Sequence, residues 1–439
     1  MVEGGQNSKD GGTSPTGETY TFADEYEWLG FTARKKIFDL LNDVLGDKSL
    51  HLDMFAYDLN EPDLINILLK LGVQGRMRII LDNAALHHSA AKPKPEDQLE
   101  KLFIKACHGK DDLILRGHFG RYAHDKVMIV SKVAGGKATK VLTGSTNSSV
   151  TGFYVNSNHV IIFNDPDVAD TYSQMFQKVW DGEVKRAPFL ATNFSTDSFP
   201  FKSAKTPSTE ITFAPHKEDF ADKILTDIAT RIAAEGKKGK TVGSVLFAVM
   251  QIDNGTSPVY QSLKTIHQNQ DIFSYGISDS PGGIYLYPVG KKTGVLVTGK
   301  PVNTQLPPPF DQVPNIGGVG HQVHHKFVVC GFSGTDPVVY CGSSNLALGG
   351  EQQNGDNLLA IHDADVATVF ALEALALVDH FNFLDRVAKG PKAKKGKQPS
   401  ASKQESAEQA GWFLSTNDSW TKPYFDPSDL HSVDRQLFG

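Results

Sequence analysis

The sequence of 439 residues contains few cysteines and no long apolar run. Three cysteines, an odd and small number, do not make a disulfide framework, so we expect Cys107, Cys330 and Cys341 to be buried thiols in a reducing compartment. No segment approaches the roughly 18 apolar residues of a membrane span. The beginning of the chain also lacks the basic and then apolar pattern of a signal peptide, which predicts a cytoplasmic protein.

The sequence also lacks an excess of basic residues. Lysine and arginine number 44 against 50 aspartate and glutamate, which gives a formal net charge of -6. This balance provides no general attraction to nucleic acid or anionic lipid, although a positive cleft can exist locally. With 40% apolar residues, a chain of this length is sufficient for two lobes that each bury a core.

One phrase of reactive residues occurs twice in the chain. Each copy reads His-x-Lys and is followed by Gly-Ser-x-Asn, with 23 positions from His to Asn in the first copy and 21 in the second. A lone His-x-Lys carries little information, but its duplication with serine and asparagine at matched offsets predicts two half-sites of one active site. The repeated residues are His124, Lys126, Ser145 and Asn147 in the first copy and His324, Lys326, Ser343 and Asn345 in the second.

The flanks of the two phrases repeat as well. Each phrase runs into an apolar stretch, a polar turn and a second apolar stretch, and the segment 158–169 resembles 357–367, with Asn158 matched to Asn357. Upstream, the apolar stretches 50–57 and 244–252 are each followed by a helical pattern. The chain is therefore predicted to be two fused copies of one α/β unit.

These residue types suit the chemistry of a phosphodiester, which repels anionic nucleophiles and has a poor alkoxide leaving group. A neutral imidazole can attack phosphorus without charge repulsion, while a second, protonated imidazole donates a proton to the departing oxygen. A lysine and an asparagine from each half can surround the non-bridging oxygens. Both histidines are therefore needed, in different protonation states.

The paired His-x-Lys and Gly-Ser-x-Asn phrases resemble the phospholipase D superfamily of phosphodiesterases over roughly residues 20–385. The resemblance implies an α/β fold of two similar lobes, each a mixed sheet flanked by helices, related by a pseudo-twofold axis with the site at their interface. It also implies a two-step displacement through a phosphohistidine, without metal or cofactor, in which His124 attacks and His324 is the acid. The repeated lysines and asparagines would bind the phosphate. A monomer is expected, because both half-sites are in one chain.

The chain departs from the family pattern at the Asp that usually stands five positions after the Lys. Ser131 and Gly331 occupy these places, as tyrosyl-DNA phosphodiesterases and some nucleases of the superfamily also lack the Asp. In many relatives an acidic residue about eleven positions after the Asn supports the histidine. Those places are Asn158 and Asp356 here, and Asp356 and Glu351 are the candidates for this support. Exposed polar loops are the alternative for both.

The sequence favours a phospholipid headgroup as the substrate, with hydrolysis or transfer to another alcohol and with peripheral membrane contact. Four aromatic residues flank the first motif and predict an apolar rim, unless they belong to the core: Phe119, Tyr122, Phe153 and Tyr154. A metal-independent nuclease of the same superfamily is the main alternative, which a basic segment at 386–403 and the missing Asp would suit.

Two alternatives of other classes explain less of the sequence. An inactive binding protein on this fold would be expected to lack a His or Lys in one half, and neither is missing. A metal-dependent hydrolase would have to use scattered residues at spacings that match no common zinc pattern, and it leaves the paired lysines unexplained. Its ligands would come from His87, His88, His321, His324 and His325 with Asp82 or Asp125.

Composition divides the chain into five parts. Residues rich in Gly, Ser and Thr predict a disordered tail, a basic stretch without acids predicts a flexible linker, and the aromatics after it predict a segment that packs on the body. The predicted parts are a tail at 1–18, a first lobe at 19–200, a second lobe at 201–385, the linker at 386–410 and the aromatic segment at 411–439.

Overall fold

The computed structural model describes most of the two predicted lobes and a short C-terminal part. The described residues are 11–109, 112–132, 137–237, 243–252, 257–269, 271–280, 283–288, 293–297, 309–313, 323–389, 418–429, 432 and 435.

The first lobe contains a six-stranded mixed sheet in the order β3-β2-β1-β5-β6-β7. Its strands are β1 (Leu50–Ala56), β2 (Met77–Asp82), β3 (Ile114–Gly117), β5 (Val127–Lys132), β6 (Ala138–Gly144) and β7 (Val160–Phe163). Strand β1 runs parallel to β2 and antiparallel to β5. Strands β1 and β5 are almost wholly buried, as expected for central strands with helices on both faces.

The second lobe repeats this arrangement within a larger sheet of order β13-β12-β11-β10-β14-β15-β16-β9-β8. Its strands are β8 (Phe199–Phe201), β9 (Ser208–Ala214), β10 (Gly243–Met250), β11 (Ile272–Ser280), β12 (Gly283–Tyr287), β13 (Val295–Val297), β14 (Phe327–Cys330), β15 (Val338–Gly342) and β16 (Asn354–His362). The central order β11-β10-β14-β15-β16 corresponds to β2-β1-β5-β6-β7, with the same parallel and antiparallel pairs. The prediction of two similar α/β units is therefore confirmed.

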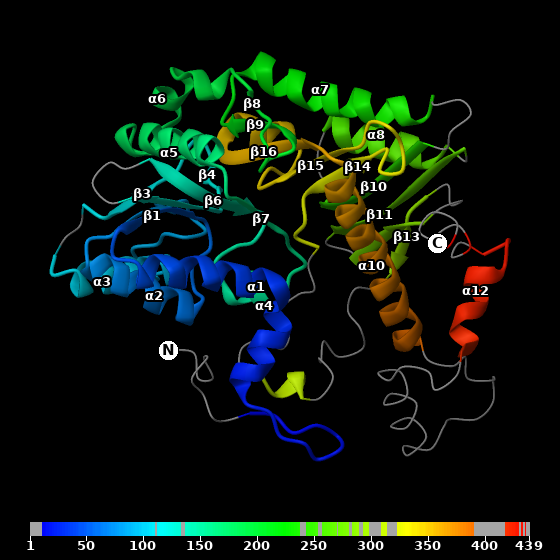
Figure 1. Cartoon of the computed structure of the whole chain (residues 1–439), viewed down its shortest axis with the longest axis horizontal. Coiled ribbons are helices and arrows are strands. Elements are labelled where there is room, and N and C mark those ends of the chain that lie inside the picture. Colours follow the sequence, from blue (N-terminus) through cyan, green and yellow to red (C-terminus); the bar gives the residue numbers. More distant parts are fainter. Residues whose placement is uncertain are drawn as a thin grey trace.

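Helices cover the outer face of each sheet and also lie between the sheets (Figure 1). The first sheet packs on α1 (Phe22–Gly46), α2 (Pro62–Val73) and α3 (Pro95–Ala106), and the second on α7 (Glu218–Glu235) and α8 (Pro258–His267). A central core joins the sheets through α5 (Pro166–Asp181) and α10 (Ala364–Lys389). The shorter helices are α4 (Val150–Tyr154), α6 (Arg186–Leu190), α9 (Leu348–Gln353) and α12 (Lys422–Phe425).

The sequence explains where α5 begins and which face it buries. The Asp165 side chain accepts a hydrogen bond from the Asp167 amide, and Pro166 stands in the first turn, where its missing N–H costs nothing. Tyr172 and Phe176 follow at a spacing of four and are buried in the central core. Helices α5 and α10 both begin at an Asp-Val-Ala segment, which occurs in both copies of the repeat.

At two places a short segment of one lobe pairs with a segment of the other lobe. Strand β4 (Tyr122–Ala123) pairs in parallel with β16 of the second lobe, and Val323 forms a parallel bridge with Ser157 of the first. Each contact lies directly before one of the repeated histidines. The chain is thereby fixed on both sides of the interface where the half-sites meet.

The ends of the lobes differ from the predicted boundaries. Strand β8 already joins the second sheet at Phe199, and α10 continues to Lys389, past the boundary predicted at 385. Residues 11–20, part of which was expected to be disordered, form a turn in which Thr13 bridges Thr19. In this turn the Thr13 backbone amide donates to Gln312 Oε1 at 3.1 Å. The first ten residues lie outside the described part.

After α10 the structure describes residues 418–429, 432 and 435. Residues 390–417, which include most of the predicted linker, lie outside the described residues. Phe425 is 67% exposed, so its ring does not pack on the body as expected for the aromatic segment. Instead the Arg435 guanidinium lies over this ring, 5.0 Å from its centroid.

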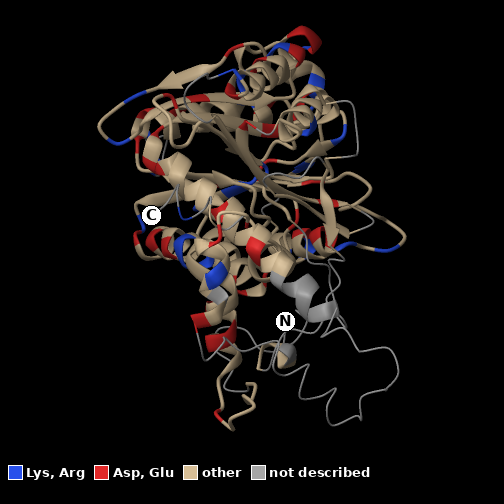
Figure 2. Ribbon diagram, turned by 90° about the vertical axis from the view of Figure 1, so that its right-hand side faces the viewer, with Lys and Arg blue, Asp and Glu red and all other residues tan. Residues whose placement is uncertain are grey.

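The remaining general predictions concern cysteines, charge and membrane spans. Cys107, Cys330 and Cys341 are buried and form no disulfide with one another, as predicted. Basic and acidic residues are interspersed over the described ribbon, in agreement with the balanced composition (Figure 2). No helix in the described part of the chain is long and apolar enough to cross a membrane.

Candidate active site

The two His-x-Lys phrases lie at strand junctions on the interface between the lobes. His124 follows β4 and precedes β5, and His324 follows the Val323 bridge and precedes β14. Because β4 pairs with β16 and Val323 pairs with Ser157, each histidine stands next to a segment of the opposite half. His124 follows the pairing with β16, and His324 follows the bridge to Ser157, which precedes β7. Both histidines are buried.

Each histidine is held by a residue of the opposite half. His124 Nδ1 lies 2.7 Å from Asp356 Oδ1, and His324 Nδ1 lies 2.8 Å from Asn158 Oδ1. Because a carboxylate or amide oxygen accepts, Nδ1 of each ring donates, which leaves Nε2 of a neutral ring with a free lone pair. The two neutral rings therefore share one tautomer, with the proton on Nδ1. Their partners differ, since one is anionic and the other is neutral.

The repeated serines support the strands that carry these partners. Ser145 Oγ donates to Asn158 Oδ1 at 2.9 Å, and Ser343 Oγ accepts from the Asn357 backbone amide at 2.9 Å. The Asn158 side-chain amide also donates to the Gly152 carbonyl at 3.0 Å, so its oxygen is directed at His324. Each serine thus contacts the partner of a histidine or the residue next to that partner.

The repeated lysines are buried close to the histidines. Lys126 Nζ donates to the His124 carbonyl and lies 5.0 Å from the centroid of the Tyr57 ring, while Lys326 Nζ donates to the His324 carbonyl at 2.9 Å. Burial lowers the pKa of Lys126 to about 8. Burial, and then the Lys126 charge, lower the pKa of Lys326 well below its usual value. An anion bound between the two ammonium groups would relieve this repulsion.

The electrostatics of the imidazoles indicate that both half-sites form one site. Burial lowers the pKa of His124, and the Asp356 carboxylate opposes this effect. Burial lowers the pKa of His324 much further, followed by the charges of Lys326, Lys126 and His124. Both rings are therefore favoured as neutral before a substrate binds. A phosphodiester anion at this position would raise both pKa values.

The repeated asparagines present unsatisfied polar atoms. The Asn147 side-chain amide donates to the Asp58 carboxylate, while its Oδ1 is buried with no hydrogen-bond partner among the described residues. Asn345 Oδ1 is likewise buried and unpartnered within the described part, and its backbone carbonyl accepts from the Tyr260 hydroxyl. Buried polar atoms without partners are costly, and they are often found where a ligand binds.

Of the two carboxylates predicted to support a repeated histidine, Asp356 contacts His124, and Glu351 contacts neither His124 nor His324 in any hydrogen bond or ion pair of the described residues. Glu351 accepts from the Ser344 hydroxyl, and its Oε2 lies 3.5 Å from His216 Nε2. Burial raises the pKa of Glu351 to about 7. Both carboxylates are buried, on α9 and β16, so the alternative of exposed polar loops is wrong.

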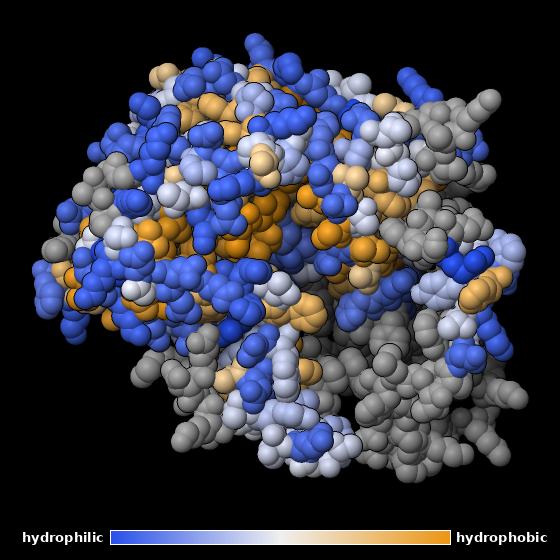
Figure 3. Space-filling view, in the orientation of Figure 1, coloured by the Kyte–Doolittle hydropathy of each residue, from blue (hydrophilic) through white to orange (hydrophobic). Residues whose placement is uncertain are grey.

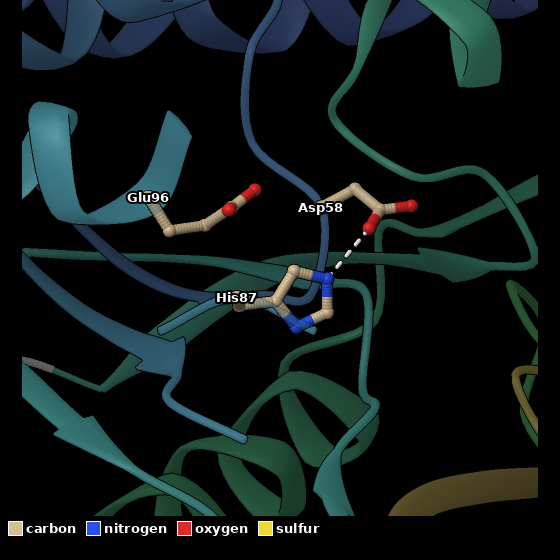
Figure 4. A group of neighbouring side chains, drawn as sticks. All are labelled: Asp58, His87 and Glu96. Atoms are coloured by element: carbon tan, nitrogen blue, oxygen red, sulfur yellow. Dashed lines mark hydrogen bonds and ion pairs between the residues drawn. The ribbon is translucent and has the colours of Figure 1, made fainter. Parts of the chain in front are cut away.

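Within the described part of the chain, the histidines of the metal-dependent alternative form no common group that could hold a metal ion. His88 binds Asp97, His325 binds Glu373 and His159, and His321 lies outside the described residues. Asp125 accepts from Asn357 Nδ2. Among the described residues, the group that could hold a metal ion is a different one, made of Asp58, His87 and Glu96 (Figure 4).

The predicted apolar rim is mostly core, but a separate cavity was not foreseen. Phe119 is buried in the central core between the sheets, and Phe153 and Tyr154 are buried in the core of the first lobe. A cavity of about 500 Å³ lies between α1 and α10 and reaches Asn158, the partner of His324. Figure 3 shows apolar side chains on both sides of a hollow in this face. Apolar lining residues include Phe31, Ile37, Phe153, Val160, Val369 and Phe370.

Comparisons with known proteins match the first lobe. Residues 45–180 match the family described as "Cardiolipin synthase, PLD-like domain". The chain is 25% identical over 140 residues to a mitochondrial cardiolipin hydrolase of Chlamydomonas reinhardtii, which covers 32% of this chain and 55% of the relative. It is 28% identical over 144 residues to the Xenopus laevis protein of the same name, covering 32% of this chain and 60% of the relative. The first lobe therefore resembles the phospholipase D superfamily, in agreement with the resemblance of the repeated phrases.

The matched stretch spans less than two thirds of either cardiolipin hydrolase. A solved phosphatidylserine synthase of Haemophilus influenzae is 9% identical with a TM-score of 0.47, and the match covers 79% of this chain and 84% of that one.

Proposed function

We propose that this chain is a phospholipase D-type phosphodiesterase that hydrolyses or transfers a phospholipid headgroup through a phosphohistidine. The observation that carries the proposal is the crossed support of the two histidines, in which His124 binds Asp356 and His324 binds Asn158. Each half-site is incomplete without the opposite half. In the proposed site, two imidazoles, two ammonium groups and two asparagines would contact one phosphate.

The unequal partners support His124 as the nucleophile of the proposed reaction. Its Nε2 bonds to phosphorus as the bond from phosphorus to the leaving oxygen breaks, and His324 gives its Nε2 proton to that oxygen. In the second step His324 takes a proton from water, whose oxygen bonds to phosphorus as the phosphorus–nitrogen bond breaks. The Asp356 carboxylate stabilises the positive charge that develops on His124 in the first step.

The proton on His324 requires the substrate. In the free protein its pKa lies well below the usual value because of burial, then the charges of Lys326, Lys126 and His124. A phosphodiester anion between the lysines compensates these charges and raises the pKa of the ring. His324 then carries a proton only when a leaving oxygen is present to accept it.

A phospholipid substrate is favoured by the cavity beside Asn158 and by the names of the relatives. Two apolar side chains at the cavity are exposed, Phe31 by 80% and Val369 by 64%. Phe31 has a φ of 50°, unusual for a residue with a side chain, at a break within α1. An acyl chain in this cavity and contact with a membrane surface would cover this apolar area.

The proposal is tested with phosphatidylcholine vesicles and with a water-soluble phosphodiester, bis(4-nitrophenyl) phosphate, in the presence of a chelator. His124→Ala and His324→Ala should each abolish turnover of the vesicles. Turnover equal to that of the natural protein in both variants would refute the site.

A charge introduced at the cavity tests whether the substrate is a lipid. Val369→Asp should lower turnover of vesicles and leave that of the soluble diester unchanged, because only a lipid needs the apolar surface. Leu372→Asp is the matched control, since Leu372 is also exposed on α10 but does not line the cavity. Equal effects of both substitutions would count against an acyl-binding cavity, and turnover of single-stranded DNA by the natural protein, but not of vesicles, would favour the nuclease.

A further inference from the structure

A buried imidazole outside the repeated motif lies behind the first half-site. His87, in the loop after β2, is 5% exposed. Its Nδ1 lies 2.8 Å from Asp82 Oδ2, and its Nε2 lies 2.8 Å from Asp58 Oδ1. Figure 4 shows the ring beside Asp58 with Glu96 across from it. Because carboxylates only accept, both ring nitrogens donate and the ring is an imidazolium.

Both carboxylates continue to residues of the active site. The second oxygen of Asp82 accepts from the Ala123 amide at 2.6 Å, directly before His124. The second oxygen of Asp58 accepts from the Asn147 side-chain amide. The Tyr57 ring packs edge-on against His87 and His124, with centroid distances of 4.3 and 4.6 Å. His87 is thus connected to the nucleophile and to a predicted phosphate ligand.

The charges around His87 favour the protonated ring. Burial lowers its pKa, but hydrogen bonds to Asp58 and Asp82 and the charges of Asp58 and Glu96 outweigh this and raise the pKa to about 9. The other charged group in contact is Arg116, which donates to the His87 carbonyl at 3.0 Å. Without the ring proton, two carboxylates would face an uncharged ring, and one of them would lose its hydrogen bond.

A metal ion is a weaker interpretation of the same group. Ligand atoms of Asp58, His87 and Glu96 lie within 4.8 Å of one another. However, both His87 nitrogens already donate to carboxylates, and Glu96 Oε1 accepts from the Leu59 amide at 3.1 Å. An ion would have to displace a proton from His87 and break this contact.

We propose that His87 is a positioning residue, which as an imidazolium holds Asp58 and Asp82 and so fixes the Asn147 amide and the main chain before His124. This inference goes beyond the proposed function and rests on it. Loss of the ring charge should move Asn147 away from the phosphate and loosen the main chain before His124. A misplacement on the order of 1 Å costs about 100-fold in rate.

The test compares His87→Gln with the matched control His88→Gln on bis(4-nitrophenyl) phosphate at pH 7.5. Gln keeps a hydrogen bond but not the charge, so kcat should fall roughly 10- to 100-fold with KM changed less than about threefold. Asp58→Asn should lower kcat similarly, and the double variant should be no worse than the stronger single variant, because both act on Asn147. The control should retain the kcat of the natural protein.

A second measurement keeps the inference separate from the proposed function. In ¹⁵N spectra of the natural protein, His87 should remain doubly protonated at pH 7.5. A neutral His87 ring would overturn the inference whether or not the protein hydrolyses a diester. If the natural protein turns over and His87→Gln has an unchanged kcat, or if the double variant shows additive losses, the inference fails and the proposed function stands. Zinc binding that requires His87 would replace it with the metal site.

Discussion

The unequal partners of the two histidines give a sharp prediction for Asp356→Asn. This substitution makes the first half-site resemble the second, because an amide oxygen would still accept from His124 Nδ1, as Asn158 does from His324. Only the negative charge is lost. We expect slower formation of the phosphohistidine, since positive charge develops on the attacking ring.

The size of the effect follows from the 2.7 Å contact between His124 and Asp356. The centres of the two charges are then about 4 Å apart, where a unit pair at an effective dielectric of about 20 is worth about 4 kcal/mol. The amide dipole retains part of this, which leaves about 2–3 kcal/mol. That loss corresponds to a roughly 30- to 150-fold fall in kcat.

The assay is steady-state turnover of bis(4-nitrophenyl) phosphate, with rapid-quench mass spectrometry of the histidine peptides. The double variant Asp356→Asn, Asn158→Asp moves the carboxylate to His324 and is the decisive companion. The covalent phosphate should be found on His124 in the natural protein and on His324 in the double variant. A kcat for Asp356→Asn within threefold of the natural value would refute the role of the charge.

Two further predictions concern pH and stability. The profile of kcat/KM should be bell-shaped. Its acid limb lies below pH 6.5, since burial lowers the pKa of His124. Activity falls on the alkaline side because His324 must take up a proton with the substrate, and it falls further as Lys126, with a pKa of about 8, loses its charge. A flat profile from pH 5 to 9 would contradict the two-histidine scheme. Arg78→Met should lower the free energy of unfolding in urea by about 2–3 kcal/mol at pH 7, because it leaves the buried Asp53 carboxylate without its two-point contact. Hydrogen bonds from His51 and Arg78 outweigh burial and lower the pKa of Asp53, so its stabilisation is present above the unfolded pKa and lost as pH falls. The variant should therefore differ less from the natural protein at pH 3 than at pH 7, and an equal difference at both would count against this pair.

The sequence was sufficient to predict the duplicated α/β unit, because apolar strands and the Asp-Val-Ala helix starts recur in the same order. The family resemblance, in which an acidic residue about eleven positions after the Asn supports the histidine, was sufficient to select Asp356. The predicted match of Asn158 with Asn357, in the two segments that follow the Gly-Ser-x-Asn phrases, was wrong by one residue. The Ser145 amide donates to the His159 carbonyl and the Ser343 amide to the Asn357 carbonyl, so His159 corresponds to Asn357 and Asn158 to Asp356.

Other contacts depend on long-range packing that local patterns do not encode. Glu351 was selected because it is near Asp356 in the chain, but α9 directs it to Ser344 and His216. His87 was considered only as a possible metal ligand, because its partners Asp58 and Asp82 follow two different strands. The ends of parallel neighbours β1 and β2 meet at one edge of the sheet, which was the available signal for this group.

The most direct test of the account is a crystal structure of the protein with vanadate, which mimics the pentacoordinate phosphorus of the transition state. The account predicts one vanadate between the lobes, with Nε2 of His124 as one apical ligand and Nε2 of His324 hydrogen-bonded to the opposite apical oxygen. Both lysines and both repeated asparagines should contact its equatorial oxygens. Histidines that open to separate surfaces, with vanadate bound to one of them alone, would contradict the shared site.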